Sequence, residues 1–260
     1  HRRAQMRRHH FQIGQEWLIS PRPGHIGKVE RVHDQRFGPQ RPSDAHLASR
    51  AGHHGGARKD APALAALCWQ LTPGLRVLTG LPLAARWPEL RPPAVEAVLD
   101  AARALSDCIV VDCGFSLETD EELSFDTLAP RRNGATIAVL DAADVVVVVG
   151  SADPIGVQRL VRGLAELREL DSSVQPWVVL NRVRRGVVPG DPVAELTGAL
   201  ERFAGCRPAA FLPLDQPAVD AALARGKTLA ETSRRGPLRA ALAELASIVV
   251  GVPTSGHRRR

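Results

Sequence analysis

The stretch "ADVVVVVGSADPIGVQRLVRGLAELREL" (residues 143–170) decides the fold class, because a strand pattern runs directly into a helix pattern. Five valines precede Gly150, and such a continuous β-branched run predicts a central parallel strand covered on both faces. Residues 154–170 then carry apolar side chains at helical spacing. Asp153 before Pro154 predicts a helix N-cap followed by proline at the first helical position. This strand–helix unit is typical of α/β proteins.

The same alternation continues on both sides of this unit. Short apolar runs predict further strands at residues 74–80, 108–112, 176–181 and 208–213. Helical spacing predicts helices at residues 92–105, 191–204 and 236–249, and the last of these is expected to pack on the sheet. Short strand–helix connections predict a doubly wound, mostly parallel α/β sheet. Ligands of such sheets bind outside the carboxyl ends of the strands, so the residues that follow each strand are informative.

Composition limits the class of protein. The chain has 260 residues, of which 44% are hydrophobic and 24% charged, as in ordinary soluble globular proteins. Its four cysteines have no metal-binding spacing, and we interpret them as reduced thiols. No apolar run reaches the roughly 18 residues that a membrane span needs. The net charge of +6 favours acidic partners.

The first 60 residues differ from the rest of the chain. They are rich in Arg, His, Gly and Pro, and show no sustained strand or helix period. We predict a disordered or non-native basic segment at residues 1–60, an α/β domain at 61–250 and a basic tail at 251–260. A basic arm that contacts nucleic acid is the alternative for the first segment.

Polar residues follow three of the predicted strands. Asp112 comes after "CIVV" and is a candidate to bind Mg²⁺, directly or through water, or to orient an attacking water. Gly114 can place a backbone N–H near a γ-phosphate. Asn181, followed by Arg182, offers an amide donor and acceptor to an adenine edge. The alternatives are a turn or capping role for Asp112 and a polar turn for Asn181.

The third strand end lies at residues 213–228, "PLDQPAVDAALARGKT". Pro213 and Asp215 are candidates to lie beside a base or ribose. The alternative for Asp215 is a helix N-cap in an ordinary strand–helix loop. Each of these signals is weak alone, but their order and spacing on one sheet strengthen the combination.

These pieces, "CIVVDCG", "VVLNRVRR" and "AAFLPLDQPAVDAALARGKTLAE", resemble the MinD/ParA-type P-loop ATPases with a deviant Walker A motif. Residues 112–154 resemble the CpaE-like branch in actinobacteria. The resemblance implies the P-loop NTPase fold, ATP and Mg²⁺ as cofactors, and an ATP-dependent homodimer. It implies that Asp112 is the catalytic switch aspartate and Mg²⁺ ligand, with Gly114 beside the nucleotide. It implies that Asn181 and Arg182 lie at the adenine and Pro213 and Asp215 beside the base.

The resemblance also implies roles for the protein. These are septum-site determination, chromosome or plasmid partitioning, and pilus or secretion assembly. It implies a cytoplasmic protein, peripheral to the inner membrane face in some members. DNA and a membrane surface are further partners of the family. Arg182, Arg184 and Arg185 are candidates to contact DNA phosphates, with a plain surface loop as the alternative.

The chain departs from the family at the phosphate loop. That loop has the form KGGxGK[ST], and here the best match is "PGHIGKVE" (residues 23–30), with Gly24, Gly27 and Lys28. Pro23, His25 and Val29 replace a lysine, a glycine and a hydroxyl residue. No strand is predicted to lead into it.

We therefore do not expect residues 23–30 to act as a phosphate loop, and we expect ATP hydrolysis to be impaired. Two alternatives to an ATPase stay open: a non-catalytic interaction protein that keeps the fold, and a DNA-binding protein that uses the basic N-terminal arm. The acidic residues 117–126 predict a solvated helix before a basic turn, or a partner surface linked to the nucleotide state.

Overall fold

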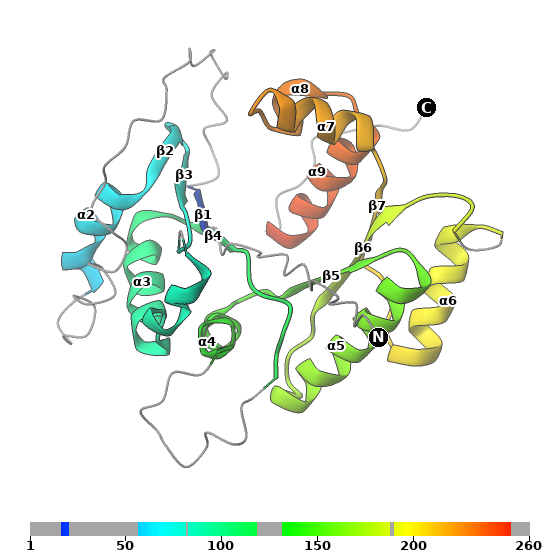
Figure 1. Ribbon diagram of the computed structural model, residues 1–260, viewed down its shortest axis with the longest axis horizontal. Coiled ribbons are helices and arrows are strands. Elements are labelled where there is room, and N and C mark those ends of the chain that lie inside the picture. The colour runs from blue at the N-terminus through cyan, green and yellow to red at the C-terminus, as the bar shows by residue number, and fades with distance from the viewer. Residues whose placement is uncertain (1–16, 21–56, 82, 119–131, 188–189, 251–260) are drawn as a thin grey trace, which may run out of the picture. The chain divides into compact units, whose positions relative to one another are not determined.

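The computed structural model describes residues 17–20, 57–81, 83–118, 132–187 and 190–250. Two compact units, residues 1–142 and 143–260, divide the chain (Figure 1). Both combine helices with a sheet, which confirms the mixed α/β class. The predicted boundaries at residues 60 and 250 stay predictions, although the first described helix already begins at Ala57.

The first unit contains a four-stranded sheet and three α-helices in its described part. The sheet has the strand order β2-β3-β1-β4, and all of its neighbouring strands are antiparallel. The elements are β1 Trp17–Ser20, α2 Ala57–Leu67, β2 Trp69–Thr72, β3 Leu75–Leu78, the 3₁₀ helix η1 Ala84–Glu89, α3 Pro92–Leu105, β4 Cys108–Val111 and α4 Gly134–Ala142.

The antiparallel sheet of this unit differs from the parallel arrangement that the sequence predicts. Only Pro73 and Gly74 separate β2 from β3, and a connection this short makes a hairpin rather than a parallel crossover. Strand β1 comes from the N-terminal segment, where no strand was expected, and lies between β3 and β4. Helix α3 has the predicted bounds, with proline at its start.

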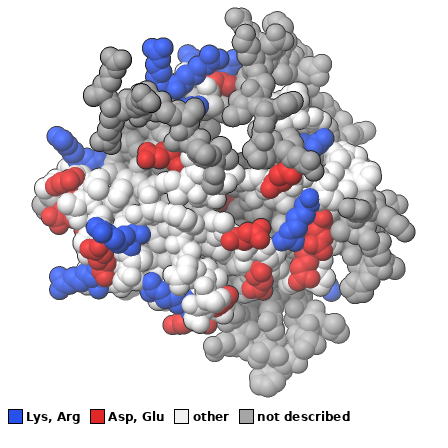
Figure 2. Space-filling view, turned by 180° about the vertical axis from the view of Figure 1, so that it is seen from behind, with Lys and Arg blue, Asp and Glu red and all other residues white. Residues whose placement is uncertain are grey.

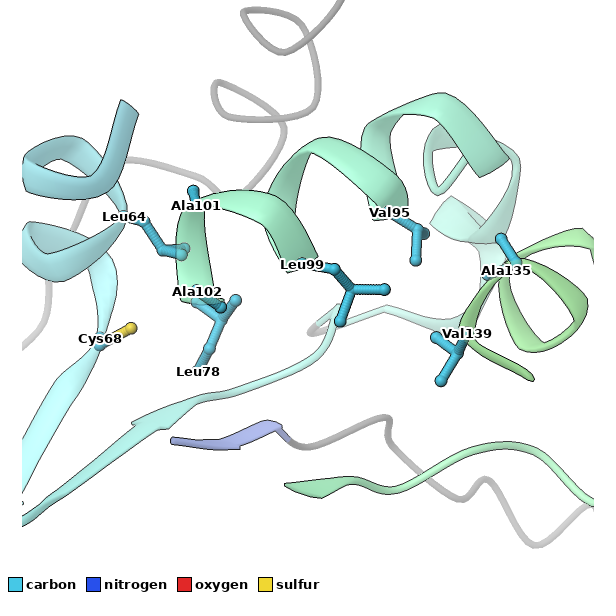
Figure 3. Close-up of a cluster of buried hydrophobic side chains, with 10 residues drawn as sticks. Leu64, Cys68, Leu78, Val95, Leu99, Ala101, Ala102, Ala135 and Val139 are labelled. Atoms are coloured by element: carbon cyan, nitrogen blue, oxygen red, sulfur yellow. The ribbon is translucent and has the colours of Figure 1, made fainter. Parts of the chain in front are cut away.

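The core of the first unit lies where α3 meets its neighbours (Figure 3). Helix α3 contributes Val95, Leu99 and Ala102, which are nearly inaccessible to solvent. Leu64 of α2 and Val139 of α4 belong to the same cluster. Helical spacing places the buried α3 residues on one face, so their burial is the main stabilisation of this unit.

The second unit is a three-layered α/β structure around a parallel sheet. The sheet has the order β5-β6-β7, and both neighbouring pairs are parallel, as predicted. Short strands alternate with helices, and the predicted elements lie within a few residues of their expected positions, whereas the helices at residues 216–224 and 229–232 were not predicted. The elements are β5 Val147–Ser151, α5 Pro154–Leu170, β6 Trp177–Val183, α6 Pro192–Ala204, β7 Ala210–Pro213, α7 Gln216–Ala224, α8 Leu229–Thr232 and α9 Pro237–Val250.

Two separate clusters cover the faces of this sheet. On one face, Val178 and Leu180 of β6 pack with side chains of α5 and α6, including Leu164 and Leu200. On the other face, Val179 packs with Leu212 of β7 and Leu238 of α9. Alternation along β6 produces this division, because successive side chains point to opposite faces. The closing helix α9 therefore packs on the sheet, as predicted.

Within the second unit, strand β5 lies at an edge of the sheet. Within the described residues it pairs with β6 alone. The side chains of Val147 and Val149 are 37% and 56% exposed, whereas Gly150, on the other face, is buried against Leu160 of α5. Helix α9 contacts β7, at the far side of the sheet from β5, so it leaves these valines open to solvent.

Asp153 caps helix α5, as predicted. Its carboxylate accepts a 2.9 Å hydrogen bond from the backbone N–H of Gly156 and another from the Ser151 hydroxyl. These bonds, the Ser151 bond first, hold the pKa of Asp153 below its usual range, and the charge of Arg184 adds to the effect. The carboxylate thus satisfies a free N–H at the helix start and complements the helix dipole.

Candidate functional site

The carboxyl ends of β6 and β7 bring together most of the predicted site residues. Asn181 and Arg182 lie at the end of β6, and Pro213 ends the adjacent strand β7. Val183 is the register partner of Pro213, and the N–H of Leu214 donates to the carbonyl of Val183 over 2.9 Å. Asp215 follows two residues after Pro213. These residues therefore share one edge of the parallel sheet, where ligands of α/β folds bind.

Asn181 is held on both sides. Its carbonyl oxygen accepts a 2.8 Å hydrogen bond from the N–H of Ala152, just beyond β5. Its side-chain Oδ1 accepts a 2.8 Å hydrogen bond from the N–H of Arg182. Within the described part of the chain, Nδ2 donates no hydrogen bond to the protein. The half-buried amide thus offers two unused donors at the edge of the sheet.

Asp215 precedes helix α7 without capping it through its side chain. The residue has φ −130° and ψ 64°, and its carboxylate accepts no capping hydrogen bond. The carbonyl oxygen of Asp215 instead accepts from the N–H of Val219 over 3.1 Å. Asp215 is therefore the N-cap residue of α7, as the alternative for it predicts, but its side chain makes no capping hydrogen bond. Its half-exposed carboxylate can accept hydrogen bonds from a ligand.

Three arginines follow Asn181 in the chain. All three are exposed: Arg182 still belongs to β6, whereas Arg184 and Arg185 lie in the surface loop expected after it. Their guanidinium groups supply positive charge beside the strand ends, which suits an anionic ligand. On the face drawn in Figure 2, however, basic and acidic side chains are interspersed among the described residues.

Asp112 and Gly114 lie in the first unit, directly after β4. The Asp112 carboxylate is exposed. Burial, with the Asp112 charge as a second cause, raises the pKa of the neighbouring Cys113 thiol to about 11. A Cβ at Gly114 would lie 3.6 Å from Oγ1 of Thr136, an ordinary contact, so packing alone does not require glycine there. The structure therefore groups Asn181, Arg182, Pro213 and Asp215, and holds Asp112 and Gly114 in a separate unit.

A strand does precede residues 23–30, so the prediction that none leads into them is wrong. Strand β1 ends at Ser20 and pairs antiparallel with β4. Ser20 is the partner of Cys108, and Trp17 is the partner of Val111. The chain therefore leaves β1 beside the start of β4, about 13 Å along the strand from its Asp112 end. In a working site the phosphate loop and Asp112 would leave their strands at the same edge.

Several predicted features lie outside the described residues. They are residues 23–30 with Gly24, Gly27 and Lys28, most of the acidic stretch 117–126, and the basic tail 251–260. The four cysteines lie within the described residues and are free thiols, as predicted. No helix in the described ranges is both long and apolar enough to span a membrane.

The side chains fit a nucleotide base better than they fit an isolated metal ion. The unused donors of Asn181 and the uncapped carboxylate of Asp215 suit the polar edges of a base and a ribose. The described residues hold no group of three or more His, Cys, Asp or Glu side chains placed for a metal ion. Mg²⁺ in nucleotide sites takes one or two carboxylates, with phosphates and waters completing its shell. Asp112 fits that role only when the nucleotide supplies the other ligands.

What the sequence did not reveal is the backbone of Arg182. This residue has φ 59°, in the left-handed region, and the peptide that it forms holds the Asn181 side chain. A glycine or an asparagine in a sequence indicates that a left-handed conformation is possible at that position, whereas an arginine does not. The residue type at position 182 therefore gave no indication of the positive φ.

Comparisons with known proteins support the fold. No protein-family model and no curated protein matches the chain. Among solved structures, the chain is similar to a ParA family ATPase from Chlorobium tepidum TLS, with a TM-score of 0.63 and 15% identity. The match covers 80% of this chain and 77% of that one. At this identity the likeness shows the architecture alone: the chain has the α/β fold of that ParA family ATPase.

Proposed function

We propose that this protein binds an adenine nucleotide at the carboxyl edge of β6 and β7. The observation that carries the proposal is the placement of Asn181 beside the Pro213–Asp215 segment on adjacent parallel strands. The fold likeness to a ParA family ATPase supports a nucleotide as the ligand. Asn181 donates from Nδ2 to the base, and Asp215 accepts from the base or the ribose.

The finer assignments belong to the same proposal. Arg182 lies at the adenine beside Asn181, and the exposed guanidinium groups of Arg184 and Arg185 meet the negative charge of the ligand. Asp112 binds Mg²⁺, directly or through water, and Gly114 lies near the terminal phosphate. The protein dimerises with ATP in the cytoplasm or at the inner membrane face, as a CpaE-like member. It serves septum-site determination, partitioning, or pilus and secretion assembly.

A second candidate is an interaction protein that keeps this fold without hydrolysing ATP. The antiparallel pairing of β1 with β4 favours it, because the chain leaves β1 at Ser20, beside the start of β4 and away from its Asp112 end. For such a protein, sedimentation should show the same self-association or the same partner affinity with and without ATP. Dimerisation that requires ATP would instead favour the ATPase.

Replacing Asn181 with alanine tests the site. The change Asn181→Ala is expected to weaken ATP binding about tenfold, because a ligand acceptor loses its donor and stays desolvated. Titration with a fluorescent ATP analogue measures the dissociation constant. Gln70→Ala, which truncates an exposed amide on β2, is the matched control and should leave it unchanged. Equal affinity in all three proteins, or no binding by the unsubstituted chain, would contradict the proposal.

A further inference from the structure

Arg182 has a backbone conformation that its residue type disfavours. Its φ of 59° makes it the one non-glycine residue with positive φ in the described ranges. Steric contact between Cβ and the following carbonyl makes this region unfavourable for L-residues other than Gly, Asn and Asp. Such conformations persist where the surrounding structure imposes them, and they concentrate at ligand sites. The strain therefore calls for a structural cause and a use.

The cause is a bulge at the end of β6. Leu180 is the partner of Phe211, and Val183 is the partner of Pro213. Two residues, Asn181 and Arg182, lie between these partners on β6, whereas only Leu212 lies between them on β7. Strand β6 therefore carries one extra residue at this point. Bulges are uncommon between parallel strands, and near functional sites they serve to re-aim a side chain.

Hydrogen bonds hold the bulge on each side. The N–H of Ala152 donates to the carbonyl of Asn181, and the N–H of Leu214 donates to the carbonyl of Val183. Between these two anchors, the N–H of Arg182 donates to Oδ1 of Asn181 over 2.8 Å. This bond fixes which end of the amide faces the backbone. Nδ2 is left as the outward end of the side chain.

We propose that Arg182 is a positioning residue that acts through its backbone, and not through its guanidinium, to present Nδ2 of Asn181 as a donor. The inference rests on the proposed nucleotide function and adds a specificity to it. A donor at this place meets adenine at N1, which is an acceptor. Guanine carries a hydrogen on N1, so a donor at that position loses its partner and can only turn to O6 or N7. The site accordingly selects an adenine nucleotide over a guanine nucleotide.

Substitutions that differ in their tolerance of positive φ test this role. Arg182→Gly and Arg182→Asn both accept the left-handed region, whereas Arg182→Val does not. Two quantities are measured on the full chain: hydrogen-exchange protection of the residue 182 N–H without nucleotide, and the ratio of ATP to GTP affinity. Gly and Asn should keep the protection and a ratio within about twofold of the original. Val should lose the protection and lower the ratio about tenfold.

Asn181→Asp provides a variant that does not depend on the fold tolerating valine. It keeps an oxygen that accepts from the Arg182 N–H, but removes both Nδ2 donors. We expect the exchange protection to survive and the ATP preference to disappear. Gln175→Val, at an exposed position with ordinary φ just before β6, is the control and should change neither quantity.

Three results would overturn the inference. If Val lowers the melting temperature but leaves the affinity ratio unchanged, Arg182 has a structural role only. If Gly and Asn lose the preference as Val does, the guanidinium is responsible. If the residue 182 N–H is unprotected in the original chain, the amide is not held at all. Absence of binding by every variant, with protection intact, would instead defeat the nucleotide function and leave the backbone arrangement standing.

Discussion

Gly156→Ala is expected to destabilise the protein by about 2–3 kcal/mol, because the new methyl group has no room. A Cβ at this position would overlap the backbone carbonyl oxygen of Ser151 and lie 2.6 Å from the Ser151 Cβ. These are backbone and near-backbone atoms, so no rotamer change relieves the contact. The same segment also carries the Asp153 cap that accepts from the Gly156 N–H, so movement of the helix would break the cap.

Gly163→Ala, on the same helix, is the matched control for this prediction. A Cβ there meets no atom within 4 Å. Alanine in a helix interior is favoured over glycine by about 0.5–1 kcal/mol, so this variant should be more stable than the original chain. Urea denaturation followed by circular dichroism measures both variants. If both variants changed the free energy of unfolding in the same direction, the close contact between Gly156 of α5 and Ser151 of β5 would be contradicted.

Leu180→Ala is expected to cost about 2–5 kcal/mol, the range for removing a fully buried leucine side chain. Leu180 has 0% of its surface exposed and packs in the cluster with Leu164 and Leu200. It also directly precedes Asn181, so a collapse of this cluster would disturb the proposed nucleotide site. Since native domains are stable by only about 5–15 kcal/mol, the loss is a large share of the total.

Leu223→Ala makes the same chemical change on the surface. The Leu223 side chain is 73% exposed, and the substitution should alter stability by less than about 0.5 kcal/mol. Denaturant unfolding separates the two variants, because a shift of the midpoint without a change in the slope m reports a change in stability. Similar losses at both positions would contradict the assignment of Leu180 to the core.

The sequence predicted most of the second unit because its helical spacing and its apolar strand runs both match the observed packing. Helix α5 has the predicted bounds, and Asp153 caps it where the residue pair Asp153–Pro154 indicates. Strand β6 follows from a run of apolar residues that alternate between two covered faces. Local pattern and tertiary packing thus demand the same structure. The strand ends, and with them the positions of Asn181 and Pro213, follow from these elements.

The first unit shows where local patterns fail. Strand β1 has four residues in a basic, irregular segment, and its place between β3 and β4 depends on pairing partners far along the chain. Pairing of that kind is set by tertiary contacts and leaves little local trace. Helix α4 was missed because Gly134–Ala142 is apolar around most of its surface, without the one-sided pattern that predicts a helix.

The candidate site was predictable by residue type and position, but not by conformation. Asn181 and Asp215 were singled out because they follow apolar runs, and the sheet places them at one edge. The bulge and the left-handed Arg182 arise from a mismatch between two strands, which no property of arginine reveals. The pairing of β1 with β4 likewise depends on register, so the position of Ser20 beside Cys108 required the structure.

The most direct test of the account is to map where a nucleotide binds. Mg²⁺–ATP is titrated into the isotope-labelled full chain, and the backbone amide resonances are followed by NMR. The account predicts saturable shifts concentrated at residues 181–185 and 213–216, with weaker effects of Mg²⁺–GTP at the same places. No shift up to millimolar ATP, or shifts confined to other parts of the sheet, would contradict the claim that these two strand ends form a nucleotide site.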